Sequence, residues 1–478
     1  MHKRTKIIAT LGPASSDEST IAALIKAGAN VFRLNFSHGT AEDHRLRCIA
    51  IRQAAARLGE QVAILGDLQG PKIRIASFAQ GPITLHSGDA FTLDTALDPA
   101  AGNQHQVGVT YPTLAEDCAP GQTLLLDDGR LELVIDSIEG TRIHTRVAIG
   151  GTLSSSKGIN LRGGGLSAPA LTAKDYQDMK TAARLNLDFL AISFPRSGDD
   201  IRFARQAALD HGCTARIVAK VERAEAVATD EALDDIILAS DVVMVARGDL
   251  GVEIGDAELI GVQKQMILRA RQLNRVVITA TQMMESMIDS PLPTRAEVFD
   301  VANAVLDGTD AVMLSAETAS GKHPVRVVEA MSRIIVGAEK QHATRNSGHR
   351  LDRTFMRTDE AVAMAAMYTA NHLPSLKAIL CLTETGNTPL WMSRIRSGIT
   401  IYGISRNPAA LRAMCMYRGV FPLPQGIDST DANEILKDAI DQLRTQGALA
   451  PGDQVLVTFG TVFGKRGETN TMKIIAVP

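Results

Sequence analysis

Eight short apolar runs, each followed by an amphipathic helical stretch, constrain the fold of this chain more than any other feature. Such alternation builds parallel sheets from βα units, because helices cover the faces of the sheet. The runs lie at Lys6 to Leu11, Asn30 to Phe36, Val62 to Leu68, Phe189 to Phe194, Ala215 to Val221, Val242 to Arg247, Val276 to Ala280 and Ala311 to Leu314. Eight units predict a closed (β/α)8 TIM barrel, an α/β fold.

The alternation is interrupted once and later resumes in a smaller unit. Residues 70–168 contain many short strand-like pieces and turn signals, which predicts an inserted all-β domain of the β-barrel kind. A polar stretch from Gln341 to Arg357 marks a second boundary. Further strands are expected near Ala378 to Leu382, Thr400 to Ile404, Gln454 to Phe459 and Lys473 to Val477. We therefore expect barrel residues 1–69 and 169–342, the insertion 70–168 and a C-terminal α/β domain 343–478.

Composition excludes several classes of partner. The 50 Lys and Arg residues face 53 Asp and Glu, so the net charge of -3 leaves no basic excess for nucleic acid. No run of 18 apolar residues exists, so no membrane-spanning helix is expected. The five cysteines form no CxxC pair, which favours a reducing compartment over a disulfide framework. We expect a soluble, cytoplasmic protein.

Polar side chains follow almost every predicted barrel strand. In an eight-stranded barrel the catalytic groups lie at these C-terminal strand ends. Solvated loops would also place polar residues there, but a lysine inside an apolar run argues otherwise, because an unpaired buried ammonium is costly. The residues are Arg33, Asn35, Ser37, Asp67, Ser193, Lys220, Glu222, Arg247, Asp249, Thr279, Thr281, Gln282, Ser315 and Glu317.

The residue types indicate an anion and a divalent cation. Glu222 and Asp249 follow neighbouring strands and suit Mg²⁺, which binds to one or two carboxylates and keeps several waters. Arg33 and Lys220 suit an anionic substrate such as a phosphate or a carboxylate. The backbone amides of Gly248 and Asp249 could hold a carboxylate at the mouth of the barrel.

Five segments resemble the pyruvate kinase family, and the match extends from the first residues to the last domain. They are Phe32 to Gly39 (FRLNFSHG), Gly66 to Arg74 (GDLQGPKIR), Val218 to Glu222 (VAKVE), Val243 to Gly251 (VMVARGDLG) and Ala280 to Met287 (ATQMMESM). The chain is similar to the bacterial branch activated by AMP-like nucleotide monophosphates or sugar phosphates. The resemblance implies a barrel, an inserted lid, a C-terminal effector-binding domain and a homotetramer. It also implies the transfer of a phosphoryl group from phosphoenolpyruvate to ADP, giving pyruvate and ATP.

The resemblance also implies roles at the reacting phosphate. Glu222 and Asp249 would hold Mg²⁺ or Mn²⁺, and Lys220 would point at the transferring phosphoryl group and the enolate oxygen. Arg33 and Ser193 would contact the same phosphate. Such transfers depend mainly on positioning and charge stabilisation.

The family places a threonine near the methylene carbon that is protonated, and Thr281 matches it. Because a hydroxyl has too high a pKa to deliver the proton alone, we expect a water relay. His38, Arg74 and Lys174 match positions on the nucleotide side.

Many pyruvate kinases require K⁺, held at the positions of Asn35, Ser37 and Asp67. They carry Glu just after the Gly-Pro that opens the lid, whereas this chain has Lys72. An ammonium reaching into the cleft can replace the charge of K⁺. We therefore expect that K⁺ is not required; the alternative is that Lys72 is a solvated hinge residue.

The family keeps an effector-phosphate loop where this chain has a Thr-rich segment after a strand. The segment comprises Thr383, Glu384, Thr385, Gly386, Asn387 and Thr388. Hydroxyls and free amides at a helix start can hold a phosphate, although an ordinary capped helix start has the same pattern. Asn387 stands where many relatives carry a basic residue, so the effector's identity stays open.

Two other functions remain compatible with the residues. A Mg²⁺-dependent lyase or aldolase could form an enolate in such a barrel, but it would have little use for a large lid. A non-catalytic metabolite sensor would be expected to lose Lys220, Glu222 or Asp249, and all three are present.

Overall fold

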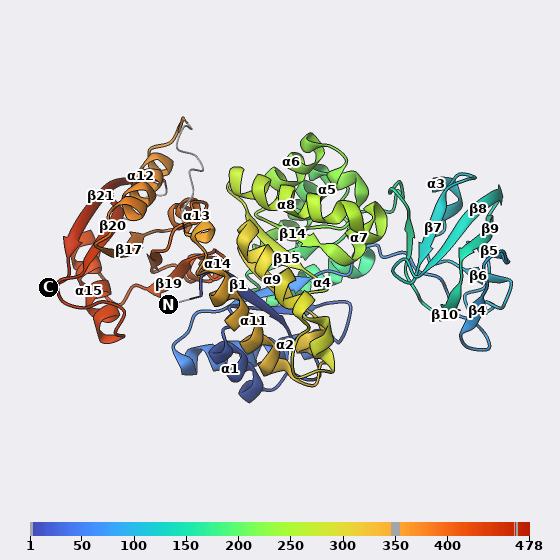
Figure 1. Ribbon diagram of the computed structural model, residues 1–478, viewed down its shortest axis with the longest axis horizontal. Coiled ribbons are helices and arrows are strands. Elements are labelled where there is room, and N and C mark those ends of the chain that lie inside the picture. The colour runs from blue at the N-terminus through green and yellow to red at the C-terminus, as the bar shows by residue number, and fades with distance from the viewer. Residues whose placement is uncertain (1–2, 346–353, 463, 465–466) are drawn as a thin grey trace.

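The computed structural model describes residues 3–345, 354–462, 464 and 467–478. It has three parts in a row: a barrel in the middle, the insertion on one side and the C-terminal part on the other (Figure 1). No helix among these residues is both long and apolar enough to cross a membrane.

The central part is a closed barrel of eight parallel strands, as the eight apolar runs predict. Around the barrel the order is β1, β16, β15, β14, β13, β12, β3 and β2. Its strands are buried on both faces, which explains why they read as continuous apolar runs. Their bounds are β1 Lys6–Thr10, β2 Val31–Asn35, β3 Ala63–Asp67, β12 Phe189–Ile192, β13 Arg216–Val221, β14 Val242–Ala246, β15 Val276–Ala280 and β16 Ala311–Leu314.

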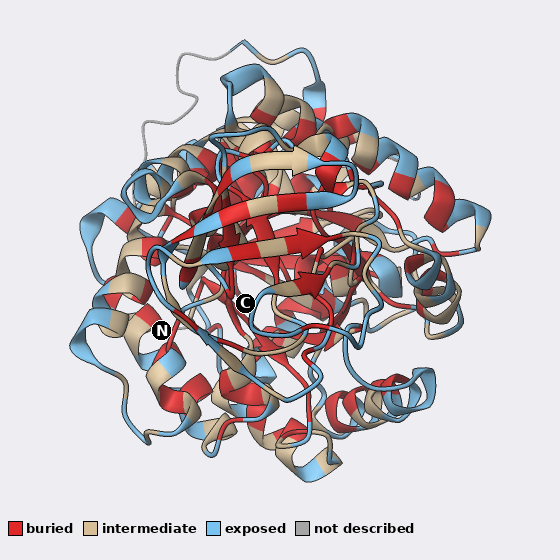
Figure 2. Ribbon diagram, turned by 90° about the vertical axis from the view of Figure 1, so that its right-hand side faces the viewer, coloured by how far each residue is buried: buried red, intermediate tan, exposed pale blue. Residues whose placement is uncertain are grey.

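The helices of the barrel form an outer ring, with exposed residues on their outer surfaces (Figure 2). Thr40, Thr172 and Thr294 each close a capping box with an acidic residue three positions later, which fixes where these helices begin. The helices are α1 Glu18–Ala27, α2 Ala41–Leu58, α4 Ala173–Arg184, α5 Gly198–Asp210, α6 Asp230–Ala239, α7 Arg247–Ile254, α8 Asp256–Gln272, α9 Arg295–Asp307, α10 Ala316–Ala319 and α11 Pro324–Ala338. Short 3₁₀ turns occur at η1 Ala224–Val227, η2 Glu285–Ile288 and η3 His342–Thr344.

The insertion between β3 and α4 pairs as two sheets rather than as the single closed barrel expected from the sequence. Six strands follow the order β11, β7, β8, β9, β5 and β6, and β10 pairs with β4. It also contains the short helix α3 Leu114–Asp117, and its other regular elements among the described residues are strands, which confirms the all-β class. The strands are β4 Ile83–Leu85, β5 Ala90–Asp94, β6 Gln106–Gly108, β7 Thr123–Leu126, β8 Leu131–Glu139, β9 Arg142–Ile149, β10 Gly151–Leu153 and β11 Ile159–Leu161.

Both connections of the insertion are bonded to the barrel. At the entry, the amide of Gly70 donates to Asp175 Oδ1 at 3.1 Å. At the exit, Gly163, Gly164 and Gly165 have φ values of 82°, 82° and 110°, a path that side chains would strain. The amide of Gly163 donates to the Glu253 carbonyl at 3.0 Å. The insertion is therefore held over one end of the barrel.

The C-terminal part is a five-stranded sheet with helices. Its order is β19, β18, β17, β20 and β21, with only β21 antiparallel. The sequence did not indicate β19, and β21 begins at Thr469 rather than at Lys473. Part of the polar stretch from Gln341 to Arg357 lies outside the described residues. The elements are α12 Thr358–His372, β17 Leu376–Leu382, α13 Asn387–Ser393, β18 Thr400–Ser405, α14 Pro408–Met414, β19 Val420–Pro424, α15 Ala432–Thr445, β20 Gln454–Gly460 and β21 Thr469–Ala476.

The C-terminal part closes the end of the barrel where the strands begin. Inward-facing strand residues such as Ile8 and Val31 share one hydrophobic core with Met392 and Met414 of this part. Arg394, fully buried, forms an ion pair with Asp310 just before β16. Only the opposite end, beneath the insertion, is left for a site at the carboxyl ends of the strands.

Candidate active site

A buried charge cluster lies at the carboxyl ends of β2, β3 and β13. Asp67 ends β3 and is 1% exposed. Its Oδ2 accepts from Arg33 Nε at 2.7 Å, and its Oδ1 lies 3.4 Å from Lys220 Nζ. Arg33 also donates to Thr10 Oγ1 at 3.1 Å. Two cations from different strands therefore converge on one carboxylate.

Lys220 joins this cluster to two further groups named from the sequence. Its Nζ donates to Ser193 Oγ at 2.7 Å and lies 2.9 Å from Glu222 Oε1. Ser193 donates to the carbonyl of Leu68 at 2.8 Å. Glu222 Oε2 accepts from the amide of Phe194 at 2.8 Å. The ammonium of Lys220 therefore has polar or charged partners at the mouth of the barrel. These partners compensate the cost of burying a charge within an apolar strand.

The charges in this cluster shift one another's pKa values. Burial disfavours the Lys220 ammonium, but the charges of Asp67 and Glu222 outweigh burial and raise its pKa above the usual value. Burial opposes the charged form of Asp67, yet Lys220 and Arg33 lower its pKa. Burial, together with the charge of Asp249, raises the pKa of Glu222. Lys220 therefore remains a fixed positive charge at neutral pH.

Asp249 lies in the first turn of α7 and contacts the insertion. Its Oδ1 is 2.9 Å from Lys72 Nζ, and Lys72 also lies 3.9 Å from Asp128 Oδ1. Lys72 is thus not a solvated hinge residue in this structure. It reaches into the cleft between the insertion and the barrel, beside Phe194, Arg223 and Glu253.

The sequence predicts that Arg247 faces the cleft beside Asp249. In the structure it does not. Helix α7 begins at Arg247, so helical geometry rather than strand alternation sets the side-chain directions. Arg247 forms a two-point pair with Asp300 at 2.7 and 2.9 Å. It also donates to the carbonyls of Ala280, Thr281 and Gln282. No pattern in the sequence indicates this pairing with Asp300.

Thr281 is held in an uncommon backbone conformation. Thr281 and Gln282 have φ values of 63° and 55°, in the left-handed region. The Thr281 hydroxyl donates to the carbonyl of Ala280 at 2.7 Å and accepts from the amide of Gly248 at 2.9 Å. The Gly248 amide, expected to hold a carboxylate, therefore already has a partner in this structure.

The three positions matched to the nucleotide side fall into two groups. His38 and Lys174 both lie close to the buried His44, whose pKa falls to about 4, mainly through burial. Lys174 Nζ donates to the carbonyl of Phe36 at 2.6 Å and to Asp178. Arg74 belongs to the insertion and donates to the carbonyl of Ser156 at 2.9 Å. Lys174 therefore lies at the turn that follows β2 and contains His38, whereas Arg74 is bonded within the insertion.

The positions matched to a K⁺ site lie along β2 and β3. Asn35 Oδ1 accepts from the amide of Ser37 at 3.1 Å, and Ser37 itself lies past the end of β2 in an exposed turn. Asp67 lies opposite Asn35 in the strand pairing. Arg33 and Lys220 already neutralise its carboxylate.

Glu222 and Asp249 are the side chains that fit a divalent metal ion. They lie close enough for the charge of Asp249 to raise the pKa of Glu222, and each carboxylate is paired with a lysine ammonium. Within the described ranges, no group of three or more His, Cys, Asp or Glu side chains forms a metal cage. The oxygens of two carboxylates are suitable ligands for Mg²⁺, which usually keeps several water molecules as its other ligands.

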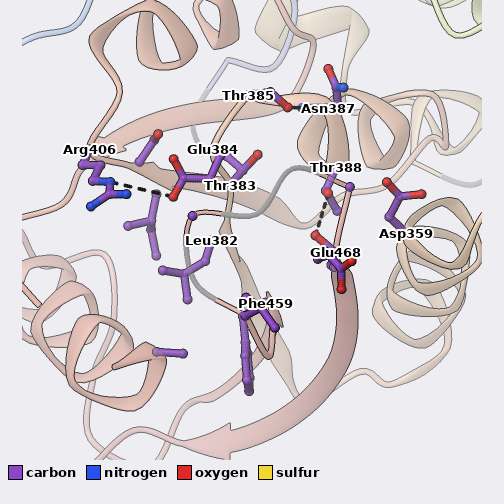
Figure 3. Close-up of a pocket in the computed structure, with 18 of the residues that line it drawn as sticks. Asp359, Leu382, Thr383, Glu384, Thr385, Asn387, Thr388, Arg406, Phe459 and Glu468 are labelled. Atoms are coloured by element: carbon purple, nitrogen blue, oxygen red, sulfur yellow. Dashed lines mark hydrogen bonds and ion pairs between the residues drawn. The ribbon is translucent and has the colours of Figure 1, made fainter. Parts of the chain in front are cut away.

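The Thr-rich segment borders a pocket in the C-terminal part (Figure 3). The amide of Gly386, with φ 84°, donates to Thr383 Oγ1 at 2.9 Å, and the amide of Asn387 donates to Thr385 Oγ1 at 3.4 Å. The hydroxyls of Thr388 and Thr469 share one hydrogen bond, with their oxygens 2.9 Å apart. These bonds give the segment the form of a folded loop.

The sequence reasoning missed several residues that line this pocket. They come from other elements: Asp359, Arg406, Phe459 and Glu468. Arg406 directly follows β18, the neighbour of β17, and its Nε lies 3.8 Å from Glu384. The rule that polar residues follow parallel strands would have found Arg406.

Comparison with known proteins identifies the family. The family models for the pyruvate kinase barrel domain and the pyruvate kinase alpha/beta domain match residues 2–328 and 360–475. Pyruvate kinase II of Salmonella typhimurium is 56% identical over 476 residues, covering 99% of both chains. A pyruvate kinase of Haemophilus influenzae is 57% identical over 459 residues, covering 96% of both chains.

A solved structure agrees with these sequence relatives. The crystal structure of a pyruvate kinase from Cryptosporidium parvum superposes with a TM-score of 0.92 at 35% identity. The match covers 100% of this chain and 96% of that one. The fold, the charge cluster at the mouth of the barrel and these relatives agree: the chain belongs to the pyruvate kinase family.

Proposed function

We propose that the enzyme transfers a phosphoryl group from phosphoenolpyruvate to ADP in a Mg²⁺-dependent reaction, and that a phosphorylated metabolite activates it. The observation that carries the site assignment is the position of Lys220, whose ammonium lies within 3.4 Å of Asp67, Glu222 and Ser193 at the mouth of the barrel. A fixed cation in a buried site stabilises charge that develops on a reacting phosphate.

The cationic side chains would bind and orient the phosphate of the substrate. Arg33 and Lys220 come from β2 and β13 and share Asp67, which holds both in place. When substrate binds, its phosphate oxygens would take the donors of Arg33 and Ser193, while Lys220 lies at the bridging oxygen. Such preorganised charge requires no rearrangement at the moment of reaction.

Glu222 and Asp249 would hold the Mg²⁺ ion, which supplies positive charge to the phosphoryl and enolate oxygens. Because Lys72 and Lys220 now neutralise these carboxylates, the two ammonium groups would shift toward the substrate's phosphate when the ion binds. Mn²⁺ would be accepted by the same oxygen donors.

Thr281 would hold the water that protonates the methylene carbon of the enolate. Its hydroxyl is fixed by the Ala280 carbonyl and the Gly248 amide. Arg247 holds the backbone of this turn through the carbonyls of Thr281 and Gln282. A water on Thr281 would therefore have a defined position, which proton transfer needs.

The insertion, residues 70–168, would act as a lid over the cleft. Closure excludes water that would hydrolyse the phosphoryl group. His38 and Lys174 would contact the nucleotide from the barrel, and Arg74 would approach it from the lid. This division fits the placement of Arg74 on the insertion.

The pocket of Figure 3 would receive the phosphate of an activating nucleotide monophosphate or sugar phosphate. Thr383, Thr385, Gly386, Asn387 and Thr388 would supply hydroxyl and amide donors. We also propose a cytoplasmic homotetramer, for which the long, nearly full-length identity to bacterial relatives is the support.

A coupled assay for ATP tests the reaction. Purified protein supplied with phosphoenolpyruvate, ADP and Mg²⁺ should form ATP and pyruvate in equal amounts. A lyase would release products without the nucleotide, and a sensor would bind metabolites without turnover. Either result would overturn the proposed function.

A further inference from the structure

A cleft of about 260 Å³ lies at the closed end of the barrel, opposite the candidate active site. The first residues of β12, β14 and β15 form one wall, and Leu390 of α13 lies across from them. Its polar lining consists of Arg216, Asp241, Asn274, Arg275, Asn387 and Tyr417. The cleft therefore lies between the C-terminal part and the floor of the barrel, which is the end where the strands begin.

Tyr417 brings a hydroxyl group to this cleft. Its side chain lines the space although the residue is only 3% exposed. Among the described residues, none forms a hydrogen bond with its hydroxyl, and the hydroxyl is not one of the enclosed side-chain atoms that lack a partner, so it is open to the cleft. It can therefore donate to a ligand that accepts a hydrogen bond.

Arg216 has hydrogen-bond donors to spare in the same place. Among the described residues, its guanidinium makes one hydrogen bond, from Nη2 to the carbonyl of Thr385 at 3.1 Å. A guanidinium has five N–H donors and can bind a carboxylate through two parallel bonds. The remaining donors are available for an anion.

The balance of charge in the cleft is positive. Asp241 is the acidic residue of the lining, and its Oδ2 already accepts from Arg205 at 2.8 Å and from the amide of Ile217 at 2.8 Å. Arg275 adds a second guanidinium, held by the carbonyls of Ser240 and Leu238. The acid is therefore compensated, and the site favours an anion over a cation.

The other wall favours a compact apolar body. Phe189, Val242 and Val276 are at most 1% exposed and line the cleft at the barrel floor. An apolar cavity of about 150 Å³ holds a benzene molecule. The present cleft has room for a ring of that size together with a polar head group.

We propose that this cleft binds a small organic carboxylate, with its carboxylate on Arg216 and the Tyr417 hydroxyl and its apolar part against the floor of the barrel. Two features connect the site to the rest of the molecule. Arg216 begins β13, the strand that carries Lys220 near its other end. Asn387 lines both this cleft and the pocket of Figure 3, where it lies near Thr385 at one edge.

The test measures binding of benzoate to the full-length protein by calorimetry, with benzamide and inorganic phosphate as comparison probes. Benzoate should bind at least tenfold more tightly than benzamide, which has the same shape without the charge. It should also bind more tightly than phosphate, which lacks the apolar body. A crystal structure with benzoate should show the ring at Val242 and Val276.

Three variants locate the interaction. Arg216→Met should weaken benzoate binding at least tenfold, and Tyr417→Phe, which keeps the ring in place, should weaken it several-fold. Arg184→Met removes an exposed arginine of α4 and should leave binding unchanged. Thermal unfolding identifies any variant that fails to fold; in that case Tyr417→Phe and the crystal structure decide.

The proposal is overturned if benzoate does not bind at millimolar concentration, if benzamide or phosphate binds as well, or if the crystal structure places benzoate elsewhere. Benzoate binding that is unchanged in folded Arg216→Met would also overturn it. The proposal does not depend on the proposed reaction, because binding is measured directly.

Discussion

The ammonium of Lys72 lies 2.9 Å from Oδ1 of Asp249 and so links the entry to the lid with the first turn of α7. The contact brings a positive charge from the lid to one of the two carboxylates proposed to hold Mg²⁺. If the substrate phosphate binds where we propose, a side chain in this position would supply the positive charge that K⁺ is expected to supply in relatives that need the ion.

The first prediction is that the enzyme is nearly fully active in tetramethylammonium salts. Lys72→Glu should lower activity, because it replaces an attraction to Asp249 by a repulsion, and K⁺ should partly restore it. Lys72→Met serves as the control that removes the charge without reversing it. Rates are compared at constant ionic strength. Strong K⁺ stimulation of the unmutated enzyme would show that Lys72 does not replace the ion.

The second prediction concerns the proposed metal ligands. Glu222→Gln and Asp249→Asn should each lower kcat by roughly 100-fold or more, since a neutral amide is a poor substitute for a carboxylate on Mg²⁺. The melting temperature should stay close to that of the unmutated protein. Asp199→Asn, in the first turn of α5 and paired with the exposed Arg202, is a matched control outside the metal site. Near-normal turnover of either ligand variant at saturating Mg²⁺ would contradict the assignment.

The third prediction separates the two halves of the reaction. Lys220→Met should eliminate ATP formation, because the cation at the transferring phosphoryl group is lost. It should still allow pyruvate to exchange its methyl protons with deuterated water, since that step depends on Mg²⁺ and the relay at Thr281. Proton NMR of pyruvate measures the exchange. Parallel loss of both activities would instead make Lys220 a general binding or structural residue.

The fourth prediction follows from Glu253, which lies where the lid exit meets the barrel. It accepts from the amide of Ala224 at 2.8 Å and from Asn160 of β11 at 3.2 Å. Burial nevertheless raises its pKa from 4.5 to about 7. Between these pH values the folded state binds more protons than the unfolded state, so this group makes stability fall as pH rises.

Glu253→Gln should remove that contribution. The melting temperature of the variant, relative to the unmutated protein, should therefore rise by a few degrees between pH 5 and pH 7.5. Glu329→Gln, an exposed carboxylate on α11, provides the control and should show no such trend. Identical pH profiles for the Glu253 variant and the unmutated protein would exclude a raised pKa at Glu253.

The barrel could be predicted from the sequence because its strands are buried on both faces and read as unbroken apolar runs. Strand β19 could not be predicted because it contains Pro422 and Pro424. Proline within a run argues against a strand, although it is tolerated in an edge strand such as β19. The pairing of the lid strands into two sheets depends on register, which short alternating segments specify weakly.

The clustering of polar groups could be predicted from the order of strands and helices, because the carboxyl ends of all strands in a parallel barrel lie at the same end of the barrel. Arg33, Asp67, Ser193, Lys220 and Glu222 lie together for this reason. The pairs Arg247 with Asp300 and Lys72 with Asp249 could not be derived in this way. The first depends on where α7 begins, and the second on how the lid is oriented.

The last prediction concerns the proposed effector pocket, for which Trp391 is a natural reporter. Trp391 lies in α13, one turn beyond the Thr-rich loop, and the guanidinium of Arg357 lies 5.2 Å from the centre of its ring. A phosphate that reorganises the loop should therefore change the surroundings of the ring. We expect the tryptophan fluorescence to change with an activating phosphomonoester but not with inorganic sulfate at equal ionic strength.

Variants of the loop decide whether activation acts through this pocket. Thr383→Ala removes the acceptor of the Gly386 amide, and Thr385→Ala removes that of the Asn387 amide, so both variants lose a donor hydroxyl and loosen the loop. Each should weaken activation by roughly tenfold in effector concentration, consistent with the loss of one or two charge-assisted hydrogen bonds, while activity without effector is retained. Thr445→Ala, at the exposed end of α15, is the matched control and should leave activation unchanged. Full activation of both loop variants would place the effector site elsewhere, because no phosphate bound to this loop could ignore the loss of both hydroxyls.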